Sequence, residues 1–268
     1  SVRTTGPGDG VRLAAEVARS GAERLIVVGG DGSVHEAANG LLTSGVADLP
    51  PLGVVPVGTG NDFARSLGSR HANPARAIAT LARAEPARWD VGRAGDEYFI
   101  NSLGIGFDAD VAVRVNRQSR LRGFPAYAVA VAQTLTRMRP LRVVARWEGG
   151  SFSGACLLIE LGNCNSTGGG FRLVPSARPD DGKLDLCLVR GIGLRAALAR
   201  LPFVLLAKHE GLRDVTLART AFLHVKAPDA AELVVHLEGE VRTCRPAELR
   251  VEIEPARLPV LIRGERHA

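Results

Sequence analysis

Four segments of the chain carry residues that could bind phosphate, hold a divalent cation or move a proton. The first is GGDGS (29–33), which directly follows the apolar run 24–28. Glycines let phosphate oxygens approach backbone N–H groups, and a helix that begins here presents the positive end of its dipole. Asp31 could hold Mg²⁺, and Ser33 could cap the helix or touch a phosphate. The alternative is a tight turn with an N-capping Asp or Ser.

A second glycine-rich segment, PVGTGNDF (56–63), ends the next apolar run along the chain. Neighbouring parallel strands end at the same edge of a sheet, where open α/β sheets bind ligands. The two loops would therefore border one crevice, with the Thr59 hydroxyl on a phosphate and Asp62 as a second carboxylate for a metal. G-T-G-N-D alone is a common loop composition, so the inference depends on the pairing of the two loops.

Acidic residues gather in the segment 175–185, after the glycine run GGGF (168–171). Asp180, Asp181 and Asp185 could bind a hard cation together with backbone carbonyls. The alternative is a hairpin turn at Asp-Asp-Gly.

The fourth segment is LEGE (237–240), where Glu238 and Glu240 flank a glycine at the end of an expected strand. Side chains two residues apart on a strand share a face, so both carboxylates could point into one cleft and exchange a proton there. The alternative is a pair of solvated acids at a turn.

One further glycine pattern is interpreted as structural. GIGFDA (104–109) fits a relaxed G-x-G-x-x-A dinucleotide fingerprint between a strand and a helix. Such sites need an acid for the ribose about 20 residues on, whereas Arg120 and Arg122 occupy that region here. We therefore expect a close helix–strand packing turn. The sequence contains no Walker-A pattern either.

The elements that position the first two segments alternate between strand and helix. Apolar runs predict strands at 24–28 and 52–57, and helical apolar spacing predicts helices at 11–20, 34–43, 61–67 and 74–84. This alternation indicates a parallel sheet with helices on its faces.

After residue 88 strands follow strands, which indicates an antiparallel, sandwich-like region. The expected strands are 97–103, 141–148, 152–161, 184–189, 214–218, 221–226, 232–237 and 249–254, with helices near 108–116, 124–138 and 194–208. We expect two abutting domains, 1–88 and 89–255, with residues 256–268 rejoining the first through a strand at 258–263.

The composition is that of a globular protein, with 46% hydrophobic and 23% charged residues among 268. The net charge of +6 comes almost entirely from arginine, which reflects either a GC-rich genome or attraction to anionic partners. Only 4% of residues are aromatic, so we expect no nucleic-acid partner. The four cysteines show no zinc or C-x-x-C spacing, which indicates reduced thiols in a cytoplasmic protein. No stretch approaches the roughly 18 apolar residues of a membrane span.

Taken together, the segments resemble the diacylglycerol kinase catalytic-domain superfamily, in the bacterial lipid-kinase branch related to sphingosine and ceramide kinases. The resemblance covers nearly the whole chain, in order, through GGDGSVHEAANGLL (29–42), LGVVPVGTGNDFARSLG (52–68), DVGRAGDEYFINSLGIGFDADVA (90–112), GGGFRLVPSARPDDGKLDL (168–186) and LEGE (237–240). G-G-D-G is shared with the more distant NAD kinases, whereas GTGNDFARSLG points to lipid kinases. The resemblance implies an α/β nucleotide-binding domain, then a β-rich antiparallel sandwich-like domain, with ATP in the cleft between them.

The same resemblance implies ATP and Mg²⁺ as cofactors, with Asp31 and Asp62 organising the catalytic ion. It implies nucleotide contacts at Thr4, Gly29, Gly30, Asp31, Gly32, Ser33, Glu36, Gly58, Thr59, Gly60, Asn61 and Asp62.

Two further roles are implied by the resemblance. Asp181, with the carbonyls of Arg178 and Lys183, matches a structural Mg²⁺ site. Glu240, with Glu238 beside it, matches the carboxylate pair that includes the catalytic base.

The chain departs from the family pattern in three places. The family's opening strand and Asn-Pro loop are absent from this sequence, which begins at Ser1, so we expect an N-terminal piece and part of the ATP site to be missing. His35 stands where Asn is usual. Glu238 stands where Asp is usual, which leaves the division of labour between Glu238 and Glu240 open.

These observations predict an ATP- and Mg²⁺-dependent kinase that phosphorylates a lipid hydroxyl by in-line transfer. The alternatives are a soluble-substrate kinase of the NAD kinase type and a catalytically degenerate nucleotide- or lipid-binding regulator. The lipid is expected at a membrane surface, which 194–208 or 114–127 could contact through mixed apolar and basic residues; core-packing helices with a basic rim are the alternative. We expect a cytoplasmic protein that is peripherally membrane-associated at most, and a homodimer is left open.

Overall fold

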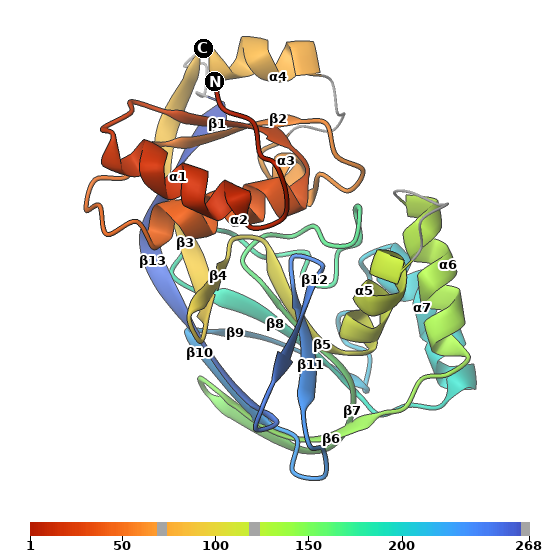
Figure 1. Ribbon diagram of the computed structural model, residues 1–268. Coiled ribbons are helices and arrows are strands. Elements are labelled where there is room, and N and C mark those ends of the chain that lie inside the picture. Colours follow the sequence, from red (N-terminus) through yellow and green to blue (C-terminus); the bar gives the residue numbers. More distant parts are fainter. Residues whose placement is uncertain (69–73, 118–123, 264–268) are drawn as a thin grey trace.

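The computed structural model describes residues 1–68, 74–117 and 124–263. These residues form an α/β region, a β-sandwich region next to it and a group of three helices at the side of the sandwich (Figure 1).

The α/β region has the alternating order that its sequence predicts. Its two strands are apolar runs that pair in parallel, with Leu25 opposite Leu52. The first two helices pack so closely that a methyl group at Gly40 would lie 2.2 Å from the carbonyl oxygen of Val11, which explains the glycine. The elements are α1 (Asp9–Arg19), β1 (Leu25–Gly29), α2 (Asp31–Leu42), β2 (Leu52–Pro56), α3 (Asp62–Ser66) and α4 (Pro74–Leu81).

The strands that follow pair with one another in antiparallel fashion. Apolar residues on their inner faces, such as Leu103, Leu161 and Leu186, are fully buried in one core. The elements are β3 (Ala84–Ala94), β4 (Glu97–Phe99), β5 (Ser102–Gly106), β6 (Leu141–Trp147), β7 (Gly150–Gly162), β8 (Leu184–Arg190), β9 (Val215–Thr220), β10 (Phe222–Lys226), β11 (Leu233–Leu237), β12 (Glu240–Cys244) and β13 (Glu248–Arg263).

The last strand, β13, belongs to both regions. It pairs with β10 in the sandwich, and Val260 pairs in parallel with Leu52 of β2, so one continuous sheet connects β1 and β2 to the sandwich. Residues 258–263 thus return to the first region. The boundary expected at residue 88 falls inside β3, and the division into two domains stays a prediction.

Three helices pack at the side of the sandwich: α5 (Phe107–Arg117), α6 (Phe124–Leu135) and α7 (Leu194–Leu205) (Figure 1). They correspond to the three helices expected after residue 88. Among the described residues, no helix is long and apolar enough to cross a membrane.

Some sequence-based expectations about elements were wrong. The strand expected over 97–103 is interrupted because the backbone N–H groups of Ile100 and Asn101 donate to the Glu238 carboxylate rather than to a neighbouring strand. The helix expected over 74–84 ends at Leu81. The strands β3 and β12 were missed because their exposed polar residues obscure the apolar pattern.

Candidate active site

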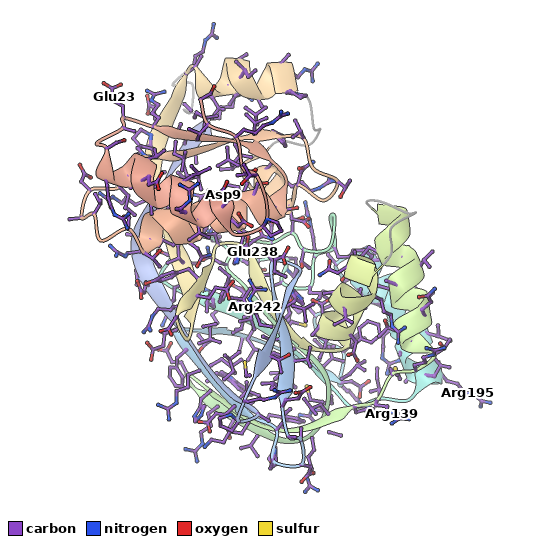
Figure 2. All side chains as sticks on the ribbon, viewed as in Figure 1. Asp9, Glu23, Arg139, Arg195, Glu238 and Arg242 are labelled. Atoms are coloured by element: carbon purple, nitrogen blue, oxygen red, sulfur yellow. The ribbon has the colours of Figure 1, made fainter. Side chains whose placement is uncertain are left out.

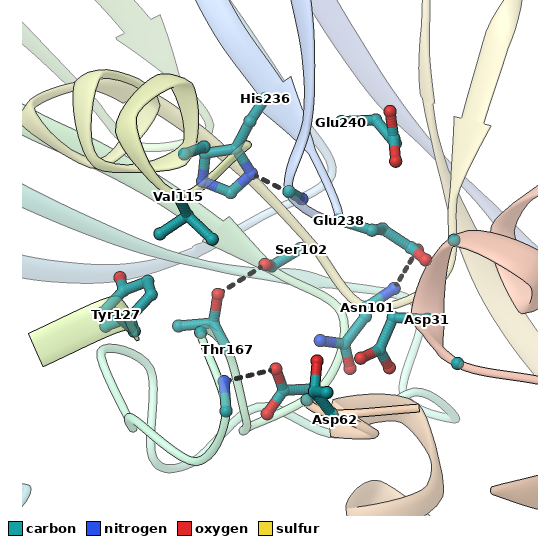
Figure 3. Close-up of a pocket in the computed structure, with 18 of the residues that line it drawn as sticks. Asp31, Asp62, Asn101, Ser102, Val115, Tyr127, Thr167, His236, Glu238 and Glu240 are labelled. Carbon is teal, nitrogen blue, oxygen red and sulfur yellow. Dashed lines mark hydrogen bonds between the residues drawn. The ribbon is translucent and has the colours of Figure 1, made fainter. Parts of the chain in front are cut away.

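A cavity lies where the α/β region meets the sandwich and the side helices. Figure 3 shows Asp31 and Asp62 on one side of it and Val115 and Tyr127 on the other. Its lining comprises Gly30, Asp31, Gly32, Gly58, Thr59, Gly60 and Asp62 from the α/β region, Asn101, Ser102, Thr167, Gly168, Gly169, His236, Glu238, Gly239 and Glu240 from the sandwich, and Asp108, Ala112, Val115, Asn116 and Tyr127 from α5 and α6. The structure therefore brings residues of the segments 29–33, 56–63 and 237–240 together, whereas Gly29, Ser33 and Asn61 lie outside the lining.

The first glycine loop joins the end of β1 to the start of α2, as expected. Gly30 is the N-cap, so the free N–H groups of the first helical turn border the cavity. A methyl group at Gly29 would lie 2.6 Å from the Ser33 hydroxyl, and one at Gly30 would lie 3.0 Å from the Gly58 Cα. Gly29 thus leaves room for Ser33 of the same segment, and Gly30 allows the close approach of the second loop.

The second loop, between β2 and α3, is locked by Asn61. This residue has a left-handed backbone (φ 54°), and its amide accepts a hydrogen bond from the Gly58 N–H (3.1 Å) and donates one to the Gly58 carbonyl (2.7 Å). A methyl group at Gly58 would lie 2.4 Å from the Gly30 Cα. Both loops therefore present backbone to the cavity, with Thr59 exposed between them.

The two aspartates of these loops have different surroundings. Asp31 Oδ1 accepts a hydrogen bond from the Phe63 N–H (3.1 Å), and burial, followed by the nearby charge of Asp62, raises the pKa of Asp31. Asp62 accepts hydrogen bonds from the Ser166 hydroxyl (2.6 Å) and the Gly169 N–H (2.7 Å). Its carboxylate thus ties the α/β region to the loop before β8.

Glu238 is a buried anchor at the point where the sandwich meets the α/β region (Figure 2). Its Oε1 accepts hydrogen bonds from the N–H groups of Ile100 and Asn101 (2.5 and 2.8 Å). Burial raises the pKa of its carboxyl group. Glu240, by contrast, is exposed, and a methyl group at Gly32 would lie 3.5 Å from its Oε1. Glu240 therefore reaches across the cavity to the first glycine loop.

The two residues that depart from the family pattern, His35 and Glu238, are neighbours. His35 Nδ1 lies 3.8 Å from Glu238 Oε2, and Nε2 lies 2.8 Å from Glu97 Oε1. Burial opposes a charge on His35, but the hydrogen bond to Glu97 and the charge of Glu238 together raise the pKa of the imidazole. Glu97 also pairs with Arg242 through both carboxylate oxygens. Glu238 Oε2 therefore faces the His35 ring at a distance too long for a hydrogen bond.

Several predicted site residues lie outside the cavity lining. Glu36 accepts hydrogen bonds from the N–H groups of Gly8 and Gly10 (2.8 and 2.9 Å), so its carboxylate holds the start of α1. Thr4 is exposed. The nucleotide contacts expected for Thr4 and Glu36 stay predictions.

The segment expected to hold a structural Mg²⁺ lies apart from this cavity. Asp181 Oδ1 accepts a hydrogen bond from the Lys183 N–H (3.1 Å), Oδ2 pairs with Arg219, and the Arg178 side chain pairs with Asp180. The metal site expected at Asp181, with the carbonyls of Arg178 and Lys183, stays a prediction.

A buried polar cluster in the cavity wall was missed by the sequence analysis. His236 Nε2 lies 2.5 Å from Asp108 Oδ2, the Tyr127 hydroxyl donates to Asp108 Oδ1 (2.8 Å), and Glu160 is fully buried beside them. Two sequence signals could have revealed part of it: His236 lies two residues before Glu238, and Asp108 lies in the GIGFDA segment. A methyl group at Gly104, on β5, would lie 2.3 Å from His236 Nε2 of the neighbouring strand and 2.7 Å from Asp108 Oδ2 of α5, so this part of the segment packs closely against a helix, as expected, and against a strand.

Comparison with known proteins gives matches over both regions. Residues 1–94 match the diacylglycerol kinase catalytic domain, and residues 101–262 match the YegS C-terminal NAD kinase beta sandwich-like domain. A solved structure of a diacylglycerol kinase from Bacillus anthracis has a TM-score of 0.74 at 23% identity, covering 97% of this chain and 84% of that one. These matches confirm the expected architecture of an α/β region followed by a β-rich sandwich-like region.

Curated relatives carry lipid kinase names. A probable YegS-like lipid kinase of Chromohalobacter salexigens is 39% identical over 184 residues, which are 68% of this chain and 59% of that protein. The diacylglycerol kinase of Bacillus subtilis is 30% identical over 246 residues, 91% of this chain and 80% of that protein. That of Mycobacterium tuberculosis H37Rv is 33% identical over 255 residues, 93% and 79% of the two chains. The chain thus spans less than two thirds of the first of these relatives.

Proposed function

The chain belongs to the diacylglycerol kinase catalytic-domain family, in the branch with a YegS-type C-terminal domain, and on that premise we propose that it transfers the γ-phosphoryl group of ATP to a lipid hydroxyl. The observation that carries the proposal is the meeting of the two glycine loops with Glu240 across one cavity. Phosphoryl transfer depends mainly on positioning and charge neutralisation, which such an arrangement supplies.

The charge of the cavity fits an enzyme that binds its nucleotide together with a divalent cation. The acidic residues of its lining are Asp31, Asp62, Asp108, Glu238 and Glu240, and no described residue of the lining is Lys or Arg. Carboxylates alone would repel a triphosphate. When bound, Mg²⁺ would neutralise the charge that develops on the transferred phosphoryl group.

Asp31 is better placed than Asp62 to hold this cation. A methyl group at Gly60 would lie 2.7 Å from Asp31 Oδ2, so this oxygen faces the second loop at the cavity wall. Both oxygens of Asp62 already accept hydrogen bonds, from Ser166 and Gly169. We therefore assign metal binding to Asp31 and the fixing of the 166–169 loop to Asp62.

Glu240 is the residue that would accept the proton of the lipid hydroxyl. Glu238 is committed to the N–H groups of Ile100 and Asn101, whereas Glu240 is exposed in the cavity. The lipid oxygen bonds to the γ-phosphorus, the bond from that phosphorus to the bridging oxygen of the β-phosphate breaks, and the proton passes to Glu240.

An apolar cavity beside the first one supports a lipid as the acceptor. Its lining consists largely of apolar side chains from α5, α6, α7 and the sandwich, such as Val131, Leu158 and Leu201. Asp108 and Tyr127 line both cavities, so the two adjoin. The cavity has a volume of about 90 Å³, so a lipid with its hydroxyl near Glu240 could bury a short adjoining apolar part there.

Helix α7 offers a surface for a bilayer. Leu205 and Leu206 at its C-terminal end are 53% and 67% exposed, and Leu198 and Phe203 are also exposed. Arg195 lies at the outer edge of the molecule (Figure 2). Apolar side chains next to basic ones favour an anionic membrane surface. In the other expected segment, 114–127, residues 118–123 lie outside the described residues. Liposome co-sedimentation that is independent of anionic lipid content would contradict this part of the proposal.

The deciding experiment is a radiolabelled ATP assay with diacylglycerol, phosphatidylglycerol, sphingosine, ceramide and NAD as acceptors, with and without Mg²⁺. We expect Mg²⁺-dependent label in at least one lipid and none in NAD. Label in NAD without lipid would indicate a soluble-substrate kinase instead. Nucleotide binding without transfer to any acceptor would indicate a binding protein.

A further inference from the structure

Asp108 and Tyr127 occupy the boundary between the polar cavity and the apolar one. Both residues line both cavities, and the Tyr127 hydroxyl donates a 2.8 Å hydrogen bond to Asp108 Oδ1. They come from different helices, α5 and α6, so the bond crosses the boundary. A molecule that extends from one cavity into the other must contact this pair.

His236 connects this pair to the turn that carries Glu240. Its Nε2 lies 2.5 Å from Asp108 Oδ2, and its Nδ1 accepts a 3.2 Å hydrogen bond from the Gly239 N–H, drawn in Figure 3. Because Nδ1 accepts, the proton of the neutral ring resides on Nε2 and is donated to Asp108. Each ring nitrogen therefore has one hydrogen-bond partner: Nδ1 accepts from Gly239, and Nε2 donates to Asp108.

The charge state of the cluster agrees with this assignment. Burial opposes a charge on Asp108, whereas the hydrogen bonds that it accepts from His236 and Tyr127 stabilise its charged form. Burial, with the adjacent charge of Asp108, raises the pKa of Glu160 well above its usual value. Asp108 is thus the anion that accepts hydrogen bonds from His236 and Tyr127, and Glu160 is a neutral neighbour.

The turn needs such support because its backbone is unusual. Glu238 has a φ of 54° and Gly239 a φ of 86°, and a left-handed conformation is costly for a glutamate. Asn116 of α5 donates a second hydrogen bond, to the Gly239 carbonyl (3.0 Å). Gly239 is therefore held on both of its backbone polar groups, by His236 and by α5, immediately before Glu240.

We propose that His236 is a positioning residue that fixes the turn before Glu240 relative to the lipid. It does so by accepting a hydrogen bond from Gly239 and by donating one to Asp108, which also accepts from Tyr127. This inference rests on the proposed lipid kinase function. It gives the histidine no contact with the reacting atoms: the lipid touches Asp108 and Tyr127, and Glu240 takes the proton.

Two substitutions separate the two tasks of the imidazole. In His236→Asn the side-chain amide oxygen can take the place of Nδ1 and accept from Gly239, but nothing reaches Asp108. In His236→Gln the amide nitrogen can take the place of Nε2 and donate to Asp108, but the Gly239 N–H loses its acceptor. His224→Gln is the matched control, because His224 of β10 forms a similar 2.6 Å pair with Glu248 of β13, and neither residue lines either cavity.

We expect the variants to split the kinetic constants for the lipid found in the acceptor assay. His236→Asn should raise the lipid KM about 10-fold with a smaller fall in kcat, because the boundary pair loses its partner. His236→Gln should lower kcat about 10- to 100-fold with a near-normal lipid KM, because Glu240 is misplaced. Nucleotide affinity should be unchanged in both, and the control His224→Gln should match the wild type.

Three results would overturn the inference. The first is an equal loss of kcat, nucleotide affinity and Tm in both His236 variants, which would indicate a purely structural histidine. The second is wild-type kinetics in both. The third is an Nδ1–H tautomer of His236 in the ¹⁵N NMR spectrum of the wild-type protein, which needs no lipid. A wild-type protein that phosphorylates no lipid hydroxyl would instead overturn the proposed function itself.

Discussion

The two walls of the cavity are built in different ways. The α/β wall consists of two glycine loops that are each shaped by nearby residues: Gly30 directly follows β1, and Asn61 holds Gly58 three residues away. The sandwich wall consists of side chains joined over long sequence separations, such as Asp108 with His236 and Glu238 with Ile100. In the proposed mechanism, the first wall would bind an anion through its backbone, and the second would accept a proton through a carboxylate that a histidine helps to position.

This difference has a consequence for how each wall tolerates substitution. A change in the α/β wall, which presents backbone, should act through geometry, because a side chain at Gly30 or Gly58 would press against the backbone of the facing loop. A change in the side-chain wall should act through a missing partner, which leaves a buried polar group unsatisfied. The predictions below test this distinction.

The largest effect is expected from substitutions that distinguish the roles of the two glutamates in the sandwich wall. Glu240→Gln should lower kcat about 10²- to 10⁴-fold, the usual contribution of a general base, with an unchanged Tm. Glu238→Ala should lower stability by about 1–3 kcal/mol, because the Ile100 and Asn101 N–H groups lose their acceptor. Kinetic assays and thermal unfolding measure the two effects. Wild-type turnover by Glu240→Gln would contradict the assignment.

A single methyl group at Gly58 should disrupt the packing of the two glycine loops in the α/β wall. That methyl would lie 2.4 Å from the Gly30 Cα, so Gly58→Ala should force the loops apart, cost about 1–3 kcal/mol and weaken nucleotide binding. Gly193→Ala is the control, because Gly193 has an ordinary φ of −76° and no atom near its would-be Cβ. Calorimetry and nucleotide titration test this. Equal behaviour of the two variants would mean that close approach of the loops is unimportant.

A smaller effect is expected where the two walls meet, at His35 and Glu238. The double variant with His35→Asn and Glu238→Asp should be more stable than the sum of the two single changes by about 1 kcal/mol, because the residues are neighbours. Denaturant unfolding of the four proteins gives this coupling energy. Strict additivity would show that the two departures from the family pattern are independent.

The smallest effect concerns pH. The His35 hydrogen bond, together with Arg242, lowers the pKa of Glu97 to about 2 from 4.5, so the stability it contributes is present above pH 4.5 and is lost as pH falls towards 2. His35 has a raised pKa, so its contribution is full below its unfolded value and is lost as pH rises through the folded one. The stability difference between wild type and Glu97→Gln should therefore shrink on acidification below pH 4.5. A stability difference that does not change with pH would contradict a stabilising interaction between Glu97 and His35.

The two walls also differ in how far the sequence predicts them. Strand, glycine turn and helix follow one another in residues 24–43, so local patterns predict both the elements and the loop. The break between β4 and β5 at Ile100 and Asn101 depends on Glu238, more than 130 residues away, and no local pattern encodes it. The Asp108–His236 contact was missed for the same reason.

The path of β13 limits how the cavity can change its width. Between Glu254 and Leu258 its pairing with β3 shifts, Ala256 has a φ of 52°, and the Ala256 N–H is held by Asp90 (2.7 Å). The pairing of β13 with β3 is regular before Glu254 and after Leu258, and these paired stretches resist sliding of one strand along the other. Bending of the α/β region against the sandwich must therefore occur at the irregular step between them. The buried Asp90 carboxylate holds the backbone at this step. We therefore expect substrates to enter the cavity without a hinge motion of the α/β region relative to the sandwich.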